Sequence, residues 1–301
     1  MKAADLFAGL GGFTEGAEAA GVRVVWAANH WQVAVDYHRL NHPNVEHQCQ
    51  DLQQADWGMV PRHDLMLASP SCTGHSVAKG REQPRHDAAR STAWAVVSCA
   101  EVHCPAVILV ENVVRFTKWK LYPAWCAALH ALGYAISPHV LDAADYGVPQ
   151  NRVRLIIVAT RSRHPFVLKP RQAEPRAIGS HIEWNRGPWR TIDKSLAPKT
   201  LQRIENGRRR FGERFVAPYY SKGSGLTGRS IERPIGTITT RDRWSVIDGN
   251  RMRMLNVHES RAAMGFRESY QLPGNSKLAK HMLGNAIAPP MATDIVEQIV
   301  V

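Results

Sequence analysis

Residues 3–20 read Ala3-Ala-Asp-Leu-Phe-Ala-Gly-Leu-Gly-Gly-Phe-Thr-Glu-Gly-Ala-Glu-Ala-Ala20, an apolar run, a glycine-rich turn and a helix-compatible stretch in direct succession. We predict a strand over 3–8 and a helix over 12–20. A turn of this kind lets a ligand approach the backbone, and a helix N-terminus favours an anionic group. Taken alone, the glycines fit a tight packing turn equally well.

A nicotinamide dinucleotide is a poor match for this turn. Its fingerprint needs a glycine at the position of Thr14, and an acidic residue at the end of the second strand. The chain has Asn29-His30-Trp31 at that second position. An oxidoreductase is therefore a distant alternative.

The alternation of strand-like and helix-like segments continues through the first half of the chain. Apolar or β-branched runs lie at 23–28, 64–68, 106–110 and 152–159, and stretches with helical spacing lie at 31–40, 92–102 and 122–132. Strands that alternate with helices of about ten residues predict an α/β fold with a doubly wound, mostly parallel sheet.

The pattern changes after this series. Residues 163–232 contain many prolines, glycines and arginines with little periodicity, which predicts a small, irregular inserted domain. Order returns in the last part, and 278–299 form a helix-compatible tail that contains Pro289 and Pro290. We therefore expect three segments, 1–162, 163–232 and 233–301, the last returning to the first domain.

Composition excludes several classes of protein. With 301 residues, of which 44% are hydrophobic and 21% charged, the chain can bury a core, which excludes disordered and fibrous proteins. It has no apolar run long enough for a membrane span and no signal-peptide pattern. Five cysteines without a zinc-type spacing predict a reduced cytoplasmic location and no metal.

Positive charge is concentrated in one segment. The net charge is −1 over residues 1–160, +9 over 161–210 and +4 over 211–301. A solvated basic face is the ordinary explanation, but Arg208, Arg209 and Arg210 stand in a row in a segment that also holds Trp184 and Trp189. This combination favours nucleic acid as the partner.

Six segments in order resemble the motifs of cytosine-C5 DNA methyltransferases. They are Asp5-Leu-Phe-Ala-Gly-Leu-Gly-Gly-Phe13, Ala68-Ser-Pro-Ser-Cys-Thr-Gly-His-Ser76, Glu111-Asn-Val113, Gln150-Asn-Arg-Val-Arg154, Arg233-Pro-Ile-Gly-Thr-Ile238 and Leu283-Gly-Asn-Ala-Ile-Ala-Pro289. The resemblance spans nearly the whole chain. It implies a Rossmann-like class I methyltransferase fold, S-adenosylmethionine as the methyl donor, and a target-recognition domain in the insert.

The catalytic residues implied by the resemblance are Cys72, Glu111, Arg152 and Arg154. Cytosine C5 is a poor nucleophile, and addition of a thiolate at C6 activates it, a step for which cysteine is well suited. Cys72 follows the predicted strand 64–68 and is the only cysteine so placed, whereas Cys99, Cys104 and Cys126 fall in or beside helical stretches and are expected in the core. Glu111 follows an apolar strand, and from there its carboxyl group can supply a proton or a strong hydrogen bond to N3 of the cytosine. Arg152 and Arg154 alternate on a predicted strand and should share one face, with Arg154 near the base O2.

The resemblance also implies how the donor is held. Phe7, Gly9, Leu10, Gly11 and Gly12 line its methionine part, Trp31 lies near adenine, Asp51 and Leu52 meet the adenine edge, and Asn285 with Ala286 closes the pocket. The chain departs from the family pattern at three positions. His30 stands where an acid usually binds the ribose, Ser71 replaces a proline that would stiffen the nucleophile loop, and Thr73 replaces a glutamine.

The substrate implied is double-stranded DNA with the target base flipped out of the helix. By resemblance, or by position in the basic segment, Ser76, Gln150, Thr237, Arg208, Arg209 and Arg210 are candidate substrate contacts. We expect a monomer in the cytoplasm, associated with the nucleoid. The alternatives are a methyltransferase of the RNA (tRNA) branch, an enzyme with a modified donor, and a DNA-binding homologue that has lost catalysis.

Overall fold

The structure is a computed structural model that describes residues 1–71, 91–169, 171–219 and 225–300. The chain forms two compact units. The first comprises residues 1–142, 153–171 and 291–301, and the second comprises 143–152 and 172–290. The predicted functional boundaries at 162/163 and 232/233 differ from this division and stay a prediction.

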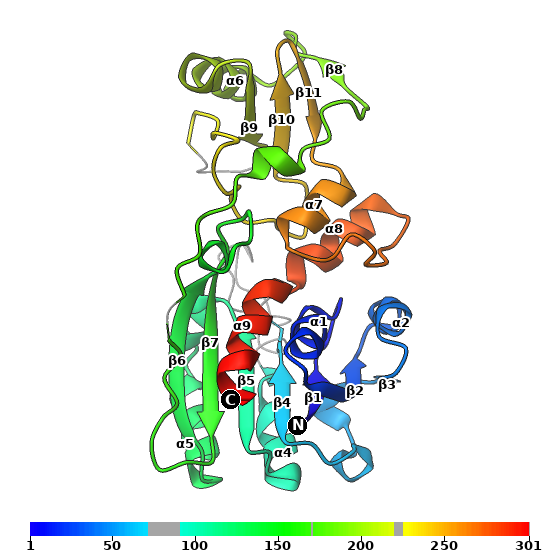
Figure 1. Cartoon of the computed structure of the whole chain (residues 1–301), viewed down its shortest axis with the longest axis vertical. Coiled ribbons are helices and arrows are strands. Elements are labelled where there is room, and N and C mark those ends of the chain that lie inside the picture. The colour runs from blue at the N-terminus through cyan, green and yellow to red at the C-terminus, as the bar shows by residue number, and fades with distance from the viewer. Residues whose placement is uncertain (72–90, 170, 220–224, 301) are drawn as a thin grey trace. The chain divides into compact units, whose positions relative to one another are not determined.

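A seven-stranded sheet forms the centre of the first unit (Figure 1). Its strands are β1 (Lys2–Leu6), β2 (Arg23–Asn29), β3 (Glu46–Cys49), β4 (Leu65–Ala68), β5 (Val107–Asn112), β6 (Ala135–Asp142) and β7 (Val153–Thr160), in the order β3-β2-β1-β4-β5-β7-β6. The first five strands are parallel, and β7 runs antiparallel to β5 and β6. The predicted mostly parallel α/β sheet is confirmed.

Helices cover both faces of this sheet. They are α1 (Gly12–Ala19), α2 (Gln32–Asn41), α4 (Trp94–His103), α5 (Tyr122–Ala131) and α9 (Pro289–Val300), with short 3-10 turns at Leu52–Gln54, Trp57–Met59 and Val114–Lys118. The main core joins β-strand side chains to Val96 and Cys99 of α4 and to Trp125 and Leu129 of α5. In Figure 1, α1 and α9 lie on the same face of the sheet.

The strand at each edge of the sheet was missing from the sequence prediction. β3 is polar, with the sequence Glu-His-Gln-Cys, because an edge strand keeps much of its surface in water. β6 contains Pro138, which cannot donate to a neighbouring strand and is therefore confined to edges. Apolar runs identify buried strands and overlook strands of this kind.

The second unit has a four-stranded antiparallel sheet. Its strands, in the order β8-β11-β10-β9, are β8 (Arg190–Thr191), β9 (Arg214–Pro218), β10 (Trp244–Asp248) and β11 (Arg251–Met254). Its helices are α6 (Pro198–Phe211), α7 (Val257–Ala263) and α8 (Ser276–Asn285), and 3-10 turns lie at Ala143–Tyr146 and Ile178–His181. Helix α6 packs on β9 so closely that a Cβ on Gly207 would lie 2.3 Å from the Phe215 ring.

The prediction of an irregular segment at 163–232 is wrong for its second half. Helix α6 spans 14 residues and strand β9 follows it. Ile204 and Gly207 give the helix a narrow buried face, and most of the remaining surface is polar. Because the buried face of α6 is so narrow, the sequence 198–211 shows no clear helical periodicity of apolar residues among its arginines.

The structure also tests the predicted burial of the cysteines and the predicted lack of a membrane span. Cys99 is buried, but Cys104 is exposed, so its predicted place in the core is wrong. Cys104 ends α4 in a left-handed conformation, with φ of 48°, which turns it out of the helix packing. Among helices in the described ranges, none combines the length and apolar character needed to cross a bilayer.

Candidate active site

The carboxyl ends of β1 to β5 meet at one edge of the parallel sheet. Register pairs Leu6 with Ala28 and Ala68, and pairs Ala68 with Val110. The loops that follow these strands therefore emerge side by side, where ligand sites of α/β sheets form. Most of the predicted cofactor and catalytic residues of the first unit belong to these loops.

The glycine-rich loop has the backbone that its sequence demands. Phe7, Gly9 and Gly11 have φ of 61°, 56° and 94°, which turns the chain sharply from β1 into α1. Helix α1 begins at Gly12, and no side chain caps it. Its first N–H groups are thus available to an anionic ligand.

A buried polar chain supports this loop from below. The Thr14 hydroxyl donates to Asp5 Oδ2 at 2.7 Å and contacts His38 Nε2 at 3.1 Å, while His38 Nδ1 contacts His47 Nε2 at 2.8 Å. Burial raises the pKa of Asp5 to about 7 and lowers that of His38 well below its ordinary value. The sequence prediction missed this chain, because its members lie on four different elements.

The predicted adenosine contacts follow β2 and β3. His30 is exposed, Trp31 is half-buried at the start of α2, and Leu52 is buried. Asp51 accepts a hydrogen bond from the Gln53 N–H at 3.0 Å. These four residues therefore reach the same sheet edge as the glycine loop.

Glu111 and Arg154 form the ion pair at this edge. Glu111 lies near the end of β5 and Arg154 near the start of the antiparallel neighbour β7, so both reach the same side of the sheet. Arg154 Nε lies 2.9 Å from Glu111 Oε1, and the side chains are 13% and 9% exposed. An enclosed, charged pair of this kind fixes the orientation of the carboxyl group.

Asn112, next to Glu111 in the chain, contacts the segment that leads to the predicted nucleophile loop. Its buried side-chain amide donates to the Pro70 carbonyl at 3.0 Å, and Ser71 N–H donates to the Thr92 hydroxyl at 3.2 Å. The chain leading to Cys72 is thus fixed beside Glu111. Cys72, Thr73 and Ser76 themselves lie outside the described residues.

Arg152 and Gln150 belong to the second unit and are buried there. Arg152 is 1% exposed, and its guanidinium donates to the carbonyls of Ile238, Gly284 and Ala286 at 2.9, 2.8 and 2.7 Å. Strand β7 begins only at Val153, so the prediction that Arg152 and Arg154 share one strand face is wrong. Two arginines of one motif thus have different surroundings.

Gln150 ties the same segments together. Its Nε2 donates to the Ala263 carbonyl at 3.0 Å, and its Oε1 accepts from the Ile238 N–H at 2.6 Å. Thr237 is half-buried, and its hydroxyl donates to the Asn151 carbonyl at 2.9 Å. Both predicted substrate contacts are therefore engaged with their own chain.

Asn285 and Ala286, the predicted closing residues of the donor pocket, stand at the end of α8. Asn285 is exposed, and its side-chain amide lies 3.2 Å from His281 Nε2. Ala286 is buried and ends the helix, and its carbonyl accepts from Arg152. Both residues belong to the second unit.

The predicted base-reading arginines occupy the last turn of α6. Arg208 donates to the Gly249 carbonyl at 2.9 Å, Arg209 lies 3.1 Å from Glu205, and the Arg210 guanidinium lies over the Phe211 ring. Part of the charge counted in the sequence is thus compensated within the unit. A role for these arginines in reading bases stays a prediction.

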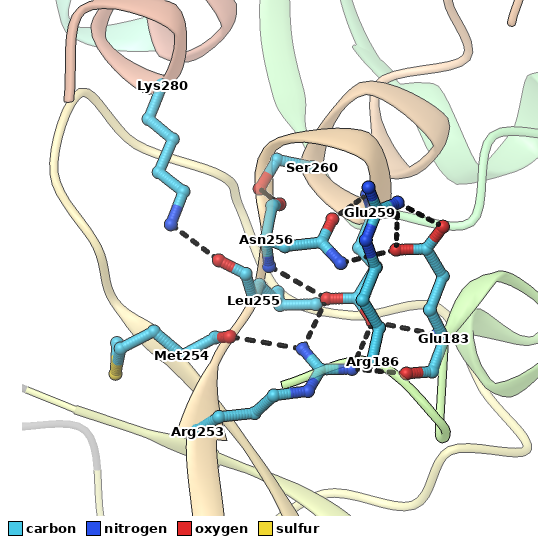
Figure 2. A network of polar contacts seen from close by, with 9 residues as sticks. All are labelled: Glu183, Arg186, Arg253, Met254, Leu255, Asn256, Glu259, Ser260 and Lys280. Atoms are coloured by element: carbon cyan, nitrogen blue, oxygen red, sulfur yellow. Dashed lines mark hydrogen bonds and ion pairs between the residues drawn. The ribbon is translucent and has the colours of Figure 1, made fainter. Parts of the chain in front are cut away.

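A buried ion-pair network also holds the second unit together (Figure 2). Glu259, 1% exposed, accepts from both terminal nitrogens of Arg253 at 2.8 and 2.6 Å and from the Glu183 and Asn256 N–H groups at 2.8 Å. Asn256 and Glu259 form a capping box at the start of α7. The spacing Asn-x-x-Glu was the available signal in the sequence, and the prediction missed it.

Metal ligands are not grouped in the part of the chain that the structure describes. Its histidine, cysteine, aspartate and glutamate side chains form no cluster that could hold a metal ion.

Comparison with known proteins gives consistent results. The model of the C-5 cytosine-specific DNA methylase family matches residues 1–301. The chain is 27% identical to the Type II methyltransferase M.NlaX of Neisseria lactamica, over 99% of this chain and 96% of the relative. It is 24% identical to the Type II methyltransferase M.HhaI of Haemophilus parahaemolyticus, over 95% and 90%.

Solved structures share the fold over the whole chain. A prophage-encoded protein of E. coli, described as a DNA modification methyltransferase, superposes with a TM-score of 0.73 at 18% identity, covering 100% of this chain and 98% of that one. DNMT2 of Spodoptera frugiperda gives 0.69 at 17% identity, covering 100% and 99%. With the family match over its full length, the chain belongs to the C-5 cytosine-specific DNA methylases.

Proposed function

We propose that this DNA cytosine-C5 methyltransferase acts on double-stranded DNA, takes its methyl group from S-adenosylmethionine and uses Cys72 as its nucleophile. The observation that carries the proposal is the Glu111–Arg154 pair, with Asn112 of the same strand end holding the Pro70 carbonyl. This arrangement fixes an acidic group beside the start of the Cys72 loop. The glycine loop reaches the same sheet edge.

Each residue has a defined task in the proposed reaction. The Cys72 thiolate forms a bond to C6 of the flipped cytosine, and the displaced electron density moves toward N3. Glu111 carries the proton that neutralises N3, and Arg154 orients Glu111 and contacts O2. C5 then attacks the methyl group, water accepts the C5 proton, and the electron pair released expels the Cys72 thiolate from C6 by elimination.

The donor site is assigned to the loops at the sheet edge. When bound, S-adenosylmethionine supplies an electrophilic methyl group on a sulfonium. The N-terminus of α1, with Phe7, Gly9, Leu10, Gly11 and Gly12, is suited to its carboxylate because the first N–H groups lack a capping side chain. His30, Trp31, Asp51 and Leu52 are assigned to the adenosine, and Asn285 with Ala286 to closure.

Arg152 and Gln150 are proposed to act by positioning. Their polar atoms bind carbonyl and N–H groups of Ile238, Ala263, Gly284 and Ala286. They hold together the chain segments that carry Thr237 and Asn285. Bacterial Type II relatives support a location in the cytoplasm, and a monomeric enzyme is part of the same proposal.

The proposal is tested by covalent trapping. Duplex DNA containing 5-fluorocytosine is incubated with the protein and S-adenosylmethionine and then separated under denaturing conditions. Wild type and Cys49→Ser, a control at an exposed cysteine, should form a stable adduct, while Cys72→Ser should form none but still bind DNA. An adduct with Cys72→Ser would refute the assignment of the nucleophile.

Product analysis then separates the remaining alternatives. Nucleoside mass spectrometry of ordinary duplex DNA should show 5-methylcytosine. A product in tRNA but not in DNA would assign the RNA branch, and a product of another mass with a different donor would replace S-adenosylmethionine. Tight DNA binding with no product under any condition would indicate a binding protein.

A further inference from the structure

A short loop in the second unit joins two parts of the predicted substrate site. Residues 239–243 connect the segment that carries Thr237 to strand β10. The loop is polar, with the sequence Thr-Thr-Arg-Asp-Arg, and Arg241 is exposed. The Thr239 hydroxyl donates to the Arg241 carbonyl at 2.9 Å, which curls the backbone around Arg241.

The first end of the loop is fixed from below. Ile238 is held through its N–H by Gln150 and through its carbonyl by Arg152. Helix α8 passes so close that a Cβ on Gly284 would lie 2.3 to 2.5 Å from backbone atoms of Thr239 and Thr240. The loop therefore lies directly on the helix, with no room for movement toward it.

The second end is fixed by a lysine of the same helix. Lys280 is buried, and its Nζ donates to Asp242 Oδ1 and to the Leu255 carbonyl, both at 2.5 Å. Figure 2 shows the Lys280 side chain reaching the Leu255 carbonyl. A lysine loses its hydration when buried, and an ion pair of this kind adds little net stability compared with an apolar pair. Its clearest physical effect is to impose one conformation on Asp242.

We propose that Lys280 is a positioning residue that fixes loop 239–243 so that Arg241 binds a phosphate of the DNA substrate. The inference rests on the proposed function, because it takes the surface around Thr237 as facing DNA. Arg241 follows Thr237 by four residues and projects from a loop anchored at both ends. A preorganised cation gains more from a phosphate than a mobile one, since less side-chain and loop entropy is lost.

The experiment compares Arg241→Gln, Lys280→Met and Lys277→Met in the full-length enzyme with duplex DNA and S-adenosylmethionine. Lys277 is an exposed lysine on the same helix and serves as the matched control. Arg241→Gln and Lys280→Met should each raise KM for DNA roughly tenfold, with kcat at saturating DNA nearly unchanged. In each variant the slope of log K for DNA binding against log salt concentration should also fall by the amount expected for about one phosphate contact. Lys277→Met should match wild type in both KM and this slope.

The double variant separates positioning from a general structural effect. If Lys280 acts through Arg241, the double variant Arg241→Gln/Lys280→Met should have nearly the same KM for DNA as Arg241→Gln alone. Lys280→Arg, which keeps the positive charge, should bind DNA more tightly than Lys280→Met. Independent, multiplying losses would overturn the inference, as would an Arg241→Gln variant with unchanged KM and salt dependence. Arg241 is exposed, so an Arg241→Gln variant with unchanged KM overturns the inference even if Lys280→Met does not fold, and Lys280→Arg then tests the positioning role. Absence of 5-methylcytosine with wild type would instead refute the proposed function.

Discussion

The two units of the molecule bury charge in different ways. In the first unit, no lysine or arginine is buried among the described residues, and the pair Glu111–Arg154 lies at the edge of the sheet. In the second unit lie all four of the buried cationic side chains among the described arginines and lysines, Arg152, Arg203, Arg253 and Lys280. Each of them donates to carbonyl oxygens of its own chain.

This difference between the two units affects how the positive charge of the sequence is interpreted. The first unit builds its core from regular strands and helices, which satisfy their own backbone groups. The second unit has short helices and strands joined by long connections. Its cationic side chains donate hydrogen bonds to backbone carbonyls that have no donor within a helix or sheet. A count of arginines in this part of the chain therefore overestimates the charge available to DNA.

The largest expected effect comes from breaking the buried pair of the second unit. Arg253→Met leaves Glu259 buried without its cation, and we expect the free energy of unfolding to fall by about 3–5 kcal/mol. Urea denaturation of this variant and of Arg210→Met, an exposed arginine of the same unit, measures it. The control should stay within about 0.5 kcal/mol. Equal stability of both variants would show that the network is dispensable.

A buried carboxyl group of the first unit has a hydroxyl as its hydrogen-bond partner. Burial raises the pKa of Asp5 to about 7, so its folded pKa lies above its unfolded value. Asp5 therefore stabilises the fold fully below about pH 4, and this contribution is lost as pH rises through 7, by at most about 4 kcal/mol.

Replacement with asparagine tests this pH dependence. Asp5→Asn should abolish that loss, so its stability relative to wild type should increase from pH 5, which lies on this slope, to pH 8, which lies above it. Asp36→Asn, an exposed carboxylate on α2, is the control. A pH-independent difference between Asp5→Asn and wild type would contradict the assignment.

Close packing in the second unit predicts a smaller loss. A Cβ on Gly284 would overlap the backbone at Thr239 and Thr240, whereas one on Gly274 meets nothing within 4 Å. Gly284→Ala should lower stability by about 1–3 kcal/mol. Gly274→Ala should be close to neutral. Thermal unfolding of the two variants gives the comparison, and equal melting temperatures would be evidence against the tight contact.

The smallest expected effect on stability is at the end of α6. Replacement of Arg208, Arg209 and Arg210 by glutamine removes surface ion pairs worth at most about 1 kcal/mol each. DNA binding should nevertheless weaken and its salt dependence should decrease, by up to about three phosphate contacts. An unchanged salt dependence would assign these arginines entirely to their contacts within the unit, with Glu205, Glu213, Gly249 and the Phe211 ring.

The sequence was most informative where the chain is regular. β1, β2, β4 and β5 were predicted because buried parallel strands are continuous apolar runs. Glu111, which lies within β5, was identified because Glu111-Asn-Val113 resembles a family motif. The polar edge strands and α6 gave no comparable signal. Arg152 looked equivalent to Arg154 because its partners lie 86 to 134 residues away, a distance that no local pattern records.

The direct test of this division of tasks compares Arg152→Met with Arg154→Met, measuring urea stability and the single-turnover rate of cytosine methylation for each. Arg152→Met should lose about 3 kcal/mol or more of stability, because it leaves three carbonyls without their donor. Arg154→Met should lose less stability than Arg152→Met, because its single ion pair lies at the sheet edge, and it should lose roughly a hundredfold in rate. A stable Arg152→Met enzyme with a lost rate, or an Arg154→Met enzyme with a normal rate, would contradict the assignment.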